Sequence, residues 1–245
     1  FYEDALDLAG GETAVLISVG EYFVHSGQYE RALEIYTTIT SSRPELVKQR
    51  LRLADIRNTL GEEDGYLADL ESLLVEDPDN PAVHKALSEV SREKNDAQKT
   101  VFHLAKFVEL APGRLEDHLQ LARLYQAADD HNLAVATLDQ TLTRFPHAVE
   151  AYYLRAMAKG RLGKYADALS DFESAESMGQ DDARVSLNDT FYFEFGVALE
   201  RSENVDEAAV KFLKALSLVA EDDSATTARI SNYFGYMWLE NNLSI

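Results

Sequence analysis

The side chains that could carry chemistry do not combine into a catalytic motif. The chain has no cysteine, which excludes disulfides, thiolate metal sites and thiol nucleophiles. It contains neither a Gly-x-Ser-x-Gly turn nor a Gly-x-Gly-x-x-Gly motif after a strand. The segment 160–164 superficially resembles a phosphate-binding loop, but Tyr165 stands where that loop requires serine or threonine. We therefore expect this segment to be a turn between two helices, and we expect no catalytic residues.

Histidines and carboxylates give no stronger signal. His84 and His118 lie 34 residues apart, but a zinc site would need a third or fourth ligand, and the sequence offers no clear one. Acidic pairs are frequent in so acidic a chain, so their presence says nothing about acid–base catalysis. We expect the two histidines to be packing residues, and we expect a protein that is not an enzyme and has no metal or cofactor.

Composition narrows the class of partner. The 245 residues carry 23 Lys and Arg against 43 Asp and Glu, a formal net charge of −20, and 46% of them are hydrophobic. That hydrophobic share is typical of a folded chain. A surface this acidic repels phosphate backbones and anionic lipid headgroups, which argues against nucleic acid as a partner. No apolar run approaches the length of a membrane span, so we expect no membrane insertion.

The elements that would position any functional surface follow from a sequence period. Four of the five prolines are Pro44, Pro78, Pro112 and Pro146, each 34 residues after the last. A period of 34 residues is typical of helix–turn–helix repeats. Taking each proline as position 32 places repeat starts at 13, 47, 81, 115 and 149. Position 8 then carries a small residue in each repeat, namely Gly20, Ala54, Ser88, Ala122 and Ala156.

A second close-contact position, position 20, is small in three of the five repeats. It reads Ala32, Tyr66, Thr100, Ala134 and Ala168. The pattern returns downstream at a longer spacing: Gly196 and Ala208 indicate a repeat that starts near 189, and Gly235 indicates a further first helix that starts near 228. Gly61 and Asn95 end predicted first helices, where a residue that tolerates positive φ is useful.

These small residues, the bulky residues between them and the spaced prolines resemble the tetratricopeptide-repeat family over nearly the whole chain. The resemblance implies an all-α fold, a right-handed α-solenoid of antiparallel helix pairs with about six full repeats and partial repeats at both ends. The expected segments are a second helix at 1–12, repeats at 13–46, 47–80, 81–114, 115–148, 149–188 and 189–227, and a first helix at 228–245. Both ends lack a polar capping helix, so we expect a piece of a longer array.

The resemblance also implies which surface binds. In the family, positions 2, 5, 9 and 12 of each first helix face a groove. Carried over to this chain, those positions give the predicted groove residues Tyr153, Met157, Phe193, Val197, Asn232, Tyr236, Lys85, Arg92 and Arg123. The aromatic half would bury apolar anchors of a partner, and the basic residues would hold carboxylates. The alternative is that the aromatics pack against adjacent helices and the charges are solvated.

Three functions remain open at this point. We expect a non-catalytic scaffold that binds a peptide or helix of a partner protein along the groove. The alternatives are a module that forms homo-oligomers through solenoid ends or faces, and a regulatory or targeting array of a larger protein. Residues 235–242 resemble first helices of bacterial members of the family, many of them exported. The compartment stays open between the cell envelope and the cytoplasm.

Overall fold

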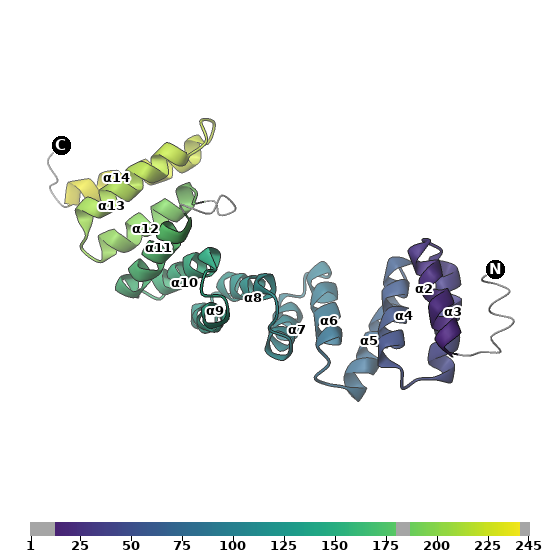
Figure 1. Ribbon diagram of the computed structural model, residues 1–245. Helices are drawn as coiled ribbons and strands as arrows, with labels where there is room; N and C mark the ends of the chain where they lie inside the picture. The colour runs from purple at the N-terminus through teal and green to yellow at the C-terminus, as the bar shows by residue number, and fades with distance from the viewer. Residues whose placement is uncertain (1–12, 180–186, 241–245) are drawn as a thin grey trace. The chain divides into compact units, whose positions relative to one another are not determined.

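The computed structural model describes residues 13–179 and 187–240, and over these residues the chain forms thirteen helices and no strand (Figure 1). Consecutive helices contact each other as antiparallel pairs, which confirms the predicted all-α class. The predicted segments 1–12 and 241–245, and residues 180–186 of the fifth predicted repeat, lie outside the described residues. None of the described helices is both long and apolar enough to cross a membrane.

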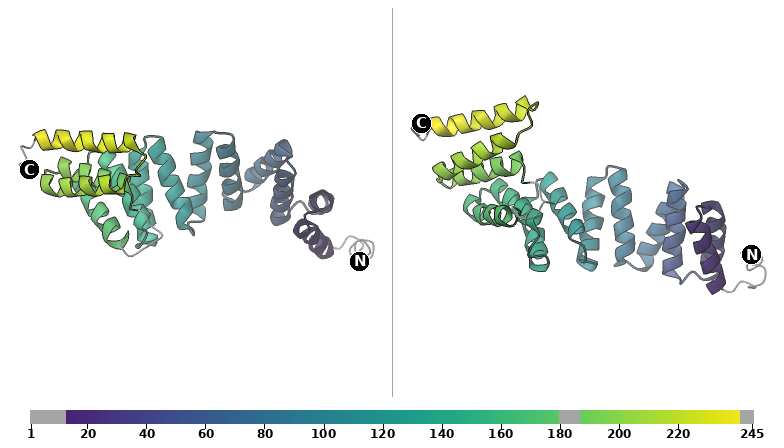
Figure 2. Two further views of the ribbon diagram at one scale, coloured as in Figure 1. Left: turned by 90° about the horizontal axis from the view of Figure 1, so that it is seen from above. Right: turned by 45° about the horizontal axis from the view of Figure 1, so that its top comes forward.

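The chain divides into two compact units, Phe1–Ala111 and Pro112–Ile245, called here the N-terminal and C-terminal units. The helices of the N-terminal unit are α2 (Thr13–His25), α3 (Tyr29–Ser42), α4 (Val47–Thr59), α5 (Glu63–Glu76), α6 (Pro81–Glu93) and α7 (Ala97–Leu110). Those of the C-terminal unit are α8 (Leu115–Ala127), α9 (His131–Arg144), α10 (Val149–Arg161), α11 (Tyr165–Gly179), α12 (Asp189–Arg201), α13 (Val205–Leu218) and α14 (Ser224–Glu240). Figure 2 follows the pairs from two further directions. That the repeats form one continuous right-handed solenoid stays a prediction.

The same turn joins the two helices of six pairs. In each turn the backbone N–H two residues past the C-cap donates to the carbonyl five residues earlier, for example from Gln28 to Phe23. This hydrogen bond defines the Schellman motif, which requires one residue with positive φ. That residue is Gly27, Gly61, Asn95, Asp129, Gly163 and Glu203 in the successive turns. The prediction of positive φ at Gly61 and Asn95 is confirmed.

The small residues at position 8 let the two helices of a pair approach closely. Gly20 is buried, and a Cβ built on it would stand 2.7 Å from the Tyr36 ring. A Cβ on Gly196 would stand 2.8 Å from the Phe212 ring. The other close-contact residues of the pattern are fully buried, namely Ala32, Ala54, Ala122, Ala134, Ala156, Ala168 and Ala208. These residues therefore fix the helix separation through sterics, as the spacing predicts.

Several positions depart from the pattern. Tyr66 and Thr100 replace alanine at position 20, yet both side chains are buried, and the Thr100 hydroxyl donates to the Asp96 carbonyl at 2.8 Å. The last described helix, α14, begins at Ser224 and not near 228. Within that helix, a Cβ on Gly235 would meet nothing within 4 Å. The close approach at Gly20 and Gly196 is therefore not repeated at Gly235.

The regularly spaced prolines have a polar role that the sequence did not reveal. Their carbonyl oxygens lie within hydrogen-bonding distance of the side chain six residues later, at position 4 of the next helix. His84 Nε2 lies 2.9 Å from the Pro78 oxygen, and the Tyr152 hydroxyl donates to Pro146 at 3.2 Å. The corresponding pairs Arg50–Pro44 and His118–Pro112 lie at 3.4 Å. These bonds tie the loop after each second helix to the next first helix.

Candidate partner-binding groove

A groove of about 580 Å³ lies on the first-helix face of the N-terminal unit. It is formed mainly by side chains of α2, α4 and α6, with one contribution from α3. The lining residues are Ile17, Glu21, Tyr36, Lys48, Gln49, Leu51, Arg52, Asp55, Ala82 and Ala86. Position 2 on α4 and α6 and positions 5 and 9 on α2 and α4 contribute to it, the positions that the resemblance assigns to the groove.

A charged network braces one wall of this groove. Arg52 donates from Nε and Nη2 to the two carboxylate oxygens of Glu21, at 3.1 and 2.6 Å. The Tyr36 hydroxyl donates to the same carboxylate at 2.6 Å. The hydrogen bond from the Arg52 guanidinium lowers the pKa of the Glu21 carboxyl. Burial raises the pKa of the Tyr36 phenol. Glu21 and Arg52 therefore neutralise each other across α2 and α4.

Two other charges in the groove have no ion-pair partner among the residues that the structure describes. Lys48 and Asp55 both lie on α4 and are exposed. The surrounding chain partly desolvates the Asp55 carboxylate and raises its pKa, while nearby Arg52 acts in the opposite direction. A positively charged group of a partner that binds beside this partly desolvated carboxylate would stabilise its ionised form.

Two of the predicted groove residues of the C-terminal unit lie close together. Met157 and Val197 line one cavity of about 90 Å³ between α10 and α12, together with the Glu194 carboxylate. Partial burial raises the pKa of Glu194, and Arg161, 4.0 Å away, lowers it by a smaller amount. Tyr153 is half-buried, and its ring packs edge-on against Phe191 at 5.3 Å between centroids.

The other two predicted aromatic groove residues differ in exposure, since Phe193 is buried and Tyr236 is exposed. Phe193 is only 7% exposed; it packs against the rings of Phe212 and Tyr233, and the Arg229 guanidinium lies 4.4 Å from its ring centroid. It contributes to the core of the C-terminal unit and offers little surface to a partner. By contrast Tyr236 is 71% exposed, and Asn232, one turn earlier on α14, is also exposed.

The predicted basic residues differ in the contacts that their charged groups already make within the chain. Arg123 is held by the carboxylates of Glu116 and Glu150. The Lys85 ammonium lies over the Phe107 ring at 5.1 Å, and Arg92 is exposed near the end of α6.

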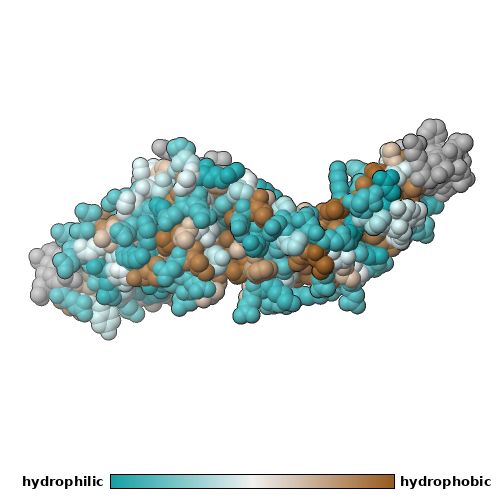
Figure 3. Space-filling model, turned by 90° about the horizontal axis from the view of Figure 1, so that it is seen from below, coloured by the Kyte–Doolittle hydropathy of each residue, from teal (hydrophilic) through white to brown (hydrophobic). Residues whose placement is uncertain are grey.

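The face drawn in Figure 3 is largely hydrophilic, with apolar residues in small separate areas.

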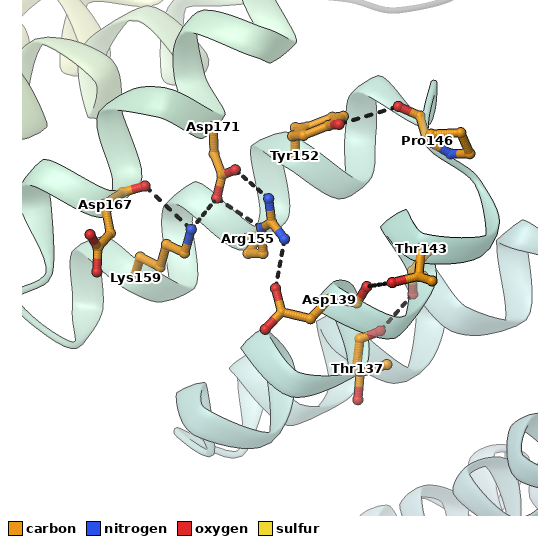
Figure 4. A network of polar contacts seen from close by, with 10 residues as sticks. Thr137, Asp139, Thr143, Pro146, Tyr152, Arg155, Lys159, Asp167 and Asp171 are labelled. Atoms are coloured by element: carbon orange, nitrogen blue, oxygen red, sulfur yellow. Dashed lines mark hydrogen bonds and ion pairs between the residues drawn. The ribbon is translucent and has the colours of Figure 1, made fainter.

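A buried ion-pair network in the C-terminal unit was not foreseen. Arg155 stands where the four preceding repeats carry Val or Leu. It donates to both oxygens of Asp171 at 2.6 and 2.9 Å and to Asp139 at 2.6 Å (Figure 4). Lys159 donates to Asp171 at 2.8 Å. The Asp171 side chain is 4% exposed. Its charge is therefore satisfied by two cations from α10, and the network links α9, α10 and α11.

His84 and His118 lie in different units. Each packs within its own unit: His84 Nδ1 lies 3.0 Å from His103 Nδ1, and His118 Nδ1 lies 3.3 Å from the Thr141 hydroxyl. Burial lowers the pKa of both His103 and His118. Within the described residues, no group of three or more His, Cys, Asp or Glu side chains is arranged to hold a metal ion.

Comparison with known proteins identifies the repeat. Residues 119–183 and 153–225 match the family model for the tetratricopeptide repeat. The chain contains tetratricopeptide repeats. Its N-terminal unit lies outside the matched residues, but its helix pairs share the same turns and close contacts. No curated protein matches the sequence significantly.

Solved structures of tetratricopeptide-repeat proteins share the fold. YrrB, a tetratricopeptide-repeat protein with an unusual peptide-binding site, aligns over 82% of this chain and 100% of its own length, with 16% identity and a TM-score of 0.65. MamA aligns over 71% of this chain and 96% of its own, with 18% identity and a TM-score of 0.55. At this level of identity the likeness concerns the fold.

The groove of the N-terminal unit was not singled out from the sequence, although groove positions of the tetratricopeptide pattern line it. The sequence favours the aromatic positions of the C-terminal unit, because large apolar side chains at groove positions are typical of binding anchors. The larger groove instead lies where α6 presents Ala82 and Ala86. Small residues at those positions leave space, and that was the signal available in the sequence.

Proposed function

We propose that this tetratricopeptide-repeat protein is a non-catalytic scaffold that binds a segment of a partner protein along its first-helix faces. The observation that carries the proposal is the groove of the N-terminal unit. Its volume of about 580 Å³ lies within the range typical of ligand sites. Its lining combines apolar side chains with a few fixed polar groups, an arrangement that gives both affinity and orientation.

Two further observations support this function. YrrB, which shares the fold, has a peptide-binding site. The tetratricopeptide repeat exposes its first-helix faces side by side, and extended surfaces of this kind suit protein segments better than small molecules.

We propose a second binding surface, within the C-terminal unit, at the predicted groove residues that remain accessible. Met157 and Val197 share a cavity, and Asn232 and Tyr236 are exposed on α14. Phe193 is left out because it is buried. In the N-terminal unit, Arg92 is the predicted basic residue best placed to reach a carboxylate, since Arg123 in the other unit already pairs with two carboxylates of its own.

The test fills the groove without changing charge. In Ala82→Gln/Ala86→Gln two longer side chains occupy the space between α4 and α6. The matched control is Ala68→Gln/Ala97→Gln, at exposed alanines of second helices. Partners are captured from the source cell with all three proteins, identified, and measured again by calorimetry with the purified partner. We expect binding to the wild type and the control and at least tenfold weaker binding to the groove variant. Equal binding by all three would reject this groove as the binding surface.

A further inference from the structure

We propose that the groove of the N-terminal unit accepts an extended segment of a partner protein that carries one acidic and one basic side chain three residues apart. The inference rests on the proposed scaffold function and specifies its ligand. It follows from which charges of the groove are already satisfied, which are not, and how far apart the unsatisfied ones lie.

Two of the four charged side chains in the groove satisfy each other. Glu21 accepts two hydrogen bonds from Arg52 and a third from Tyr36. The Tyr36 ring is itself 1% exposed and packs against Gly20, so this wall is rigid. A partner therefore meets no net charge at the Glu21–Arg52 pair.

The remaining two charges, Lys48 and Asp55, form no ion pair within 4.0 Å in the part of the chain that the structure describes, and both line the groove. They have opposite signs, so the groove presents a positive and a negative point. Complementary charges on a partner would steer and orient it. An acidic side chain at Lys48 and a basic one at Asp55 fit this arrangement.

The spacing of these two points fits an extended peptide. Lys48 and Asp55 are seven residues apart on α4, about two helical turns, so they lie on one face about 10 Å apart along the axis. An extended chain in the polyproline II conformation advances about 3.1 Å per residue and completes a turn in three residues, so side chains three residues apart lie on one face. Three residues of a partner therefore span the same distance. A helical partner would need about seven residues to do so.

Apolar side chains also line the groove. Ile17 and Leu51 contribute branched apolar side chains, and Ala82 and Ala86 leave space opposite them. Side chains between the two charged residues of the partner would bury apolar area there, which adds affinity. The charges then set the direction and register of the bound segment.

The experiment reverses the charges of the groove. A displayed library of random twelve-residue peptides is selected against the full chain, against Lys48→Glu/Asp55→Lys, and against the control Glu71→Lys/Lys99→Glu, which exchanges two exposed charges on second helices. All three proteins have the same net charge. One enriched peptide, and the version with its acidic and basic residues exchanged, are then synthesised with a fluorescent label and titrated by anisotropy.

We expect the wild type and the control to enrich an acidic and a basic residue three apart and to prefer the same peptide of the pair. The reversed variant should prefer the exchanged peptide, an inversion of at least about tenfold in the ratio of dissociation constants. Single variants Lys48→Gln and Asp55→Asn should each weaken the selected peptide about three- to fivefold.

Two results would overturn the inference. One is enrichment of peptides that lack the charge pair but compete with the partner for the groove; in that case the scaffold function stands and the ligand class is wrong. The other is an unchanged peptide preference in the reversed variant. A failure of the scaffold function itself is different, because Ala82→Gln/Ala86→Gln would then keep its full affinity for every captured partner.

Discussion

Gly20 and Tyr36 connect the packing of the first helix pair to the wall of the groove. A Cβ on Gly20 would stand 2.7 Å from the Tyr36 ring, and the hydroxyl of that ring donates to Glu21 at 2.6 Å. The absence of a side chain on Gly20 therefore lets the phenol reach the groove carboxylate of the neighbouring residue. Gly20, which sets the separation of the two helices, therefore directly contacts Tyr36, which shapes the groove.

The first prediction concerns the two tight glycines. Gly20→Ala and Gly196→Ala should each lower the free energy of unfolding by about 1–3 kcal/mol, because the buried rings of Tyr36 and Phe212 cannot move away. Alanine's higher helix propensity, worth about 1 kcal/mol, offsets only part of this. The control is Gly235→Ala, where the added methyl has open space and stability should be unchanged or higher. Urea denaturation measures all three, and equal effects at all three sites would contradict the steric explanation.

The second prediction concerns the ion-pair network. Arg155→Leu restores the apolar residue of the other repeats but leaves Asp171 with only Lys159. We expect a loss of about 2–3 kcal/mol in the free energy of unfolding, less than for a buried charge left wholly unpaired. Adding Asp171→Leu should recover part of the loss, since the buried carboxylate is then gone, while Lys159 still loses its ion-pair partner. A double-mutant cycle by chemical denaturation measures the coupling, and purely additive effects would argue against the network.

The third prediction concerns pH. Burial lowers the pKa of His103 and His118 below the ordinary histidine value of 6.5, so the unfolded chain takes up protons first as pH falls. The stability that these neutral histidines contribute is therefore fully present above pH 6.5 and is lost as pH falls below that value through the lower pKa of the folded state. When the pH is lowered from 7.5 to 5.5, the free energy of unfolding should decrease less for the His103→Gln/His118→Gln variant than for the wild type. The two proteins are compared by urea denaturation at both pH values, and parallel losses would exclude the histidines as the cause.

The fourth prediction concerns the turn between α12 and α13. Glu203 has φ of 66°, where a side chain is strained and three of the other turns use glycine. Glu203→Gly should raise the free energy of unfolding by about 0.5–1 kcal/mol. The control Glu207→Gly lies in the first turn of α13 and should destabilise the protein by about 1 kcal/mol. Thermal melting followed by circular dichroism separates them, and a destabilised Glu203→Gly variant would show that the strain is absent.

The sequence predicted the helices well because their signals are local and repeated. The proline period placed first helices at Thr13, Val47, Pro81, Leu115 and Val149, the residues at which α2, α4, α6, α8 and α10 begin. Gly196 and Ala208 placed another near 189, where α12 begins. The period weakened at α14, which begins at Ser224. The residues before it do not follow the spacing of 34, so no repeated signal fixed that boundary.

The candidate site was harder to predict because side-chain type does not reveal accessibility. Tyr153, Phe193 and Tyr236 are all aromatic and occupy groove positions, yet Phe193 is buried, Tyr153 is half-buried and Tyr236 is exposed. Their exposure depends on which neighbouring helix covers them. Likewise Arg123 is a groove cation by position, but Glu116 and Glu150 already hold it.

By itself the sequence therefore determined the all-helical class, the pairing of helices and the turns between them. Each depends on residues close in the chain, on small side chains at fixed spacing and on backbone conformations that only some residues adopt. The tertiary structure decided which charges are free. Glu21 finds Arg52 across 31 residues and Arg155 finds Asp171 on the facing helix, while Lys48 and Asp55 find no partner among the described residues. Ion pairing depends on distances of a few ångströms between helices, and no pattern within one helix fixes those distances.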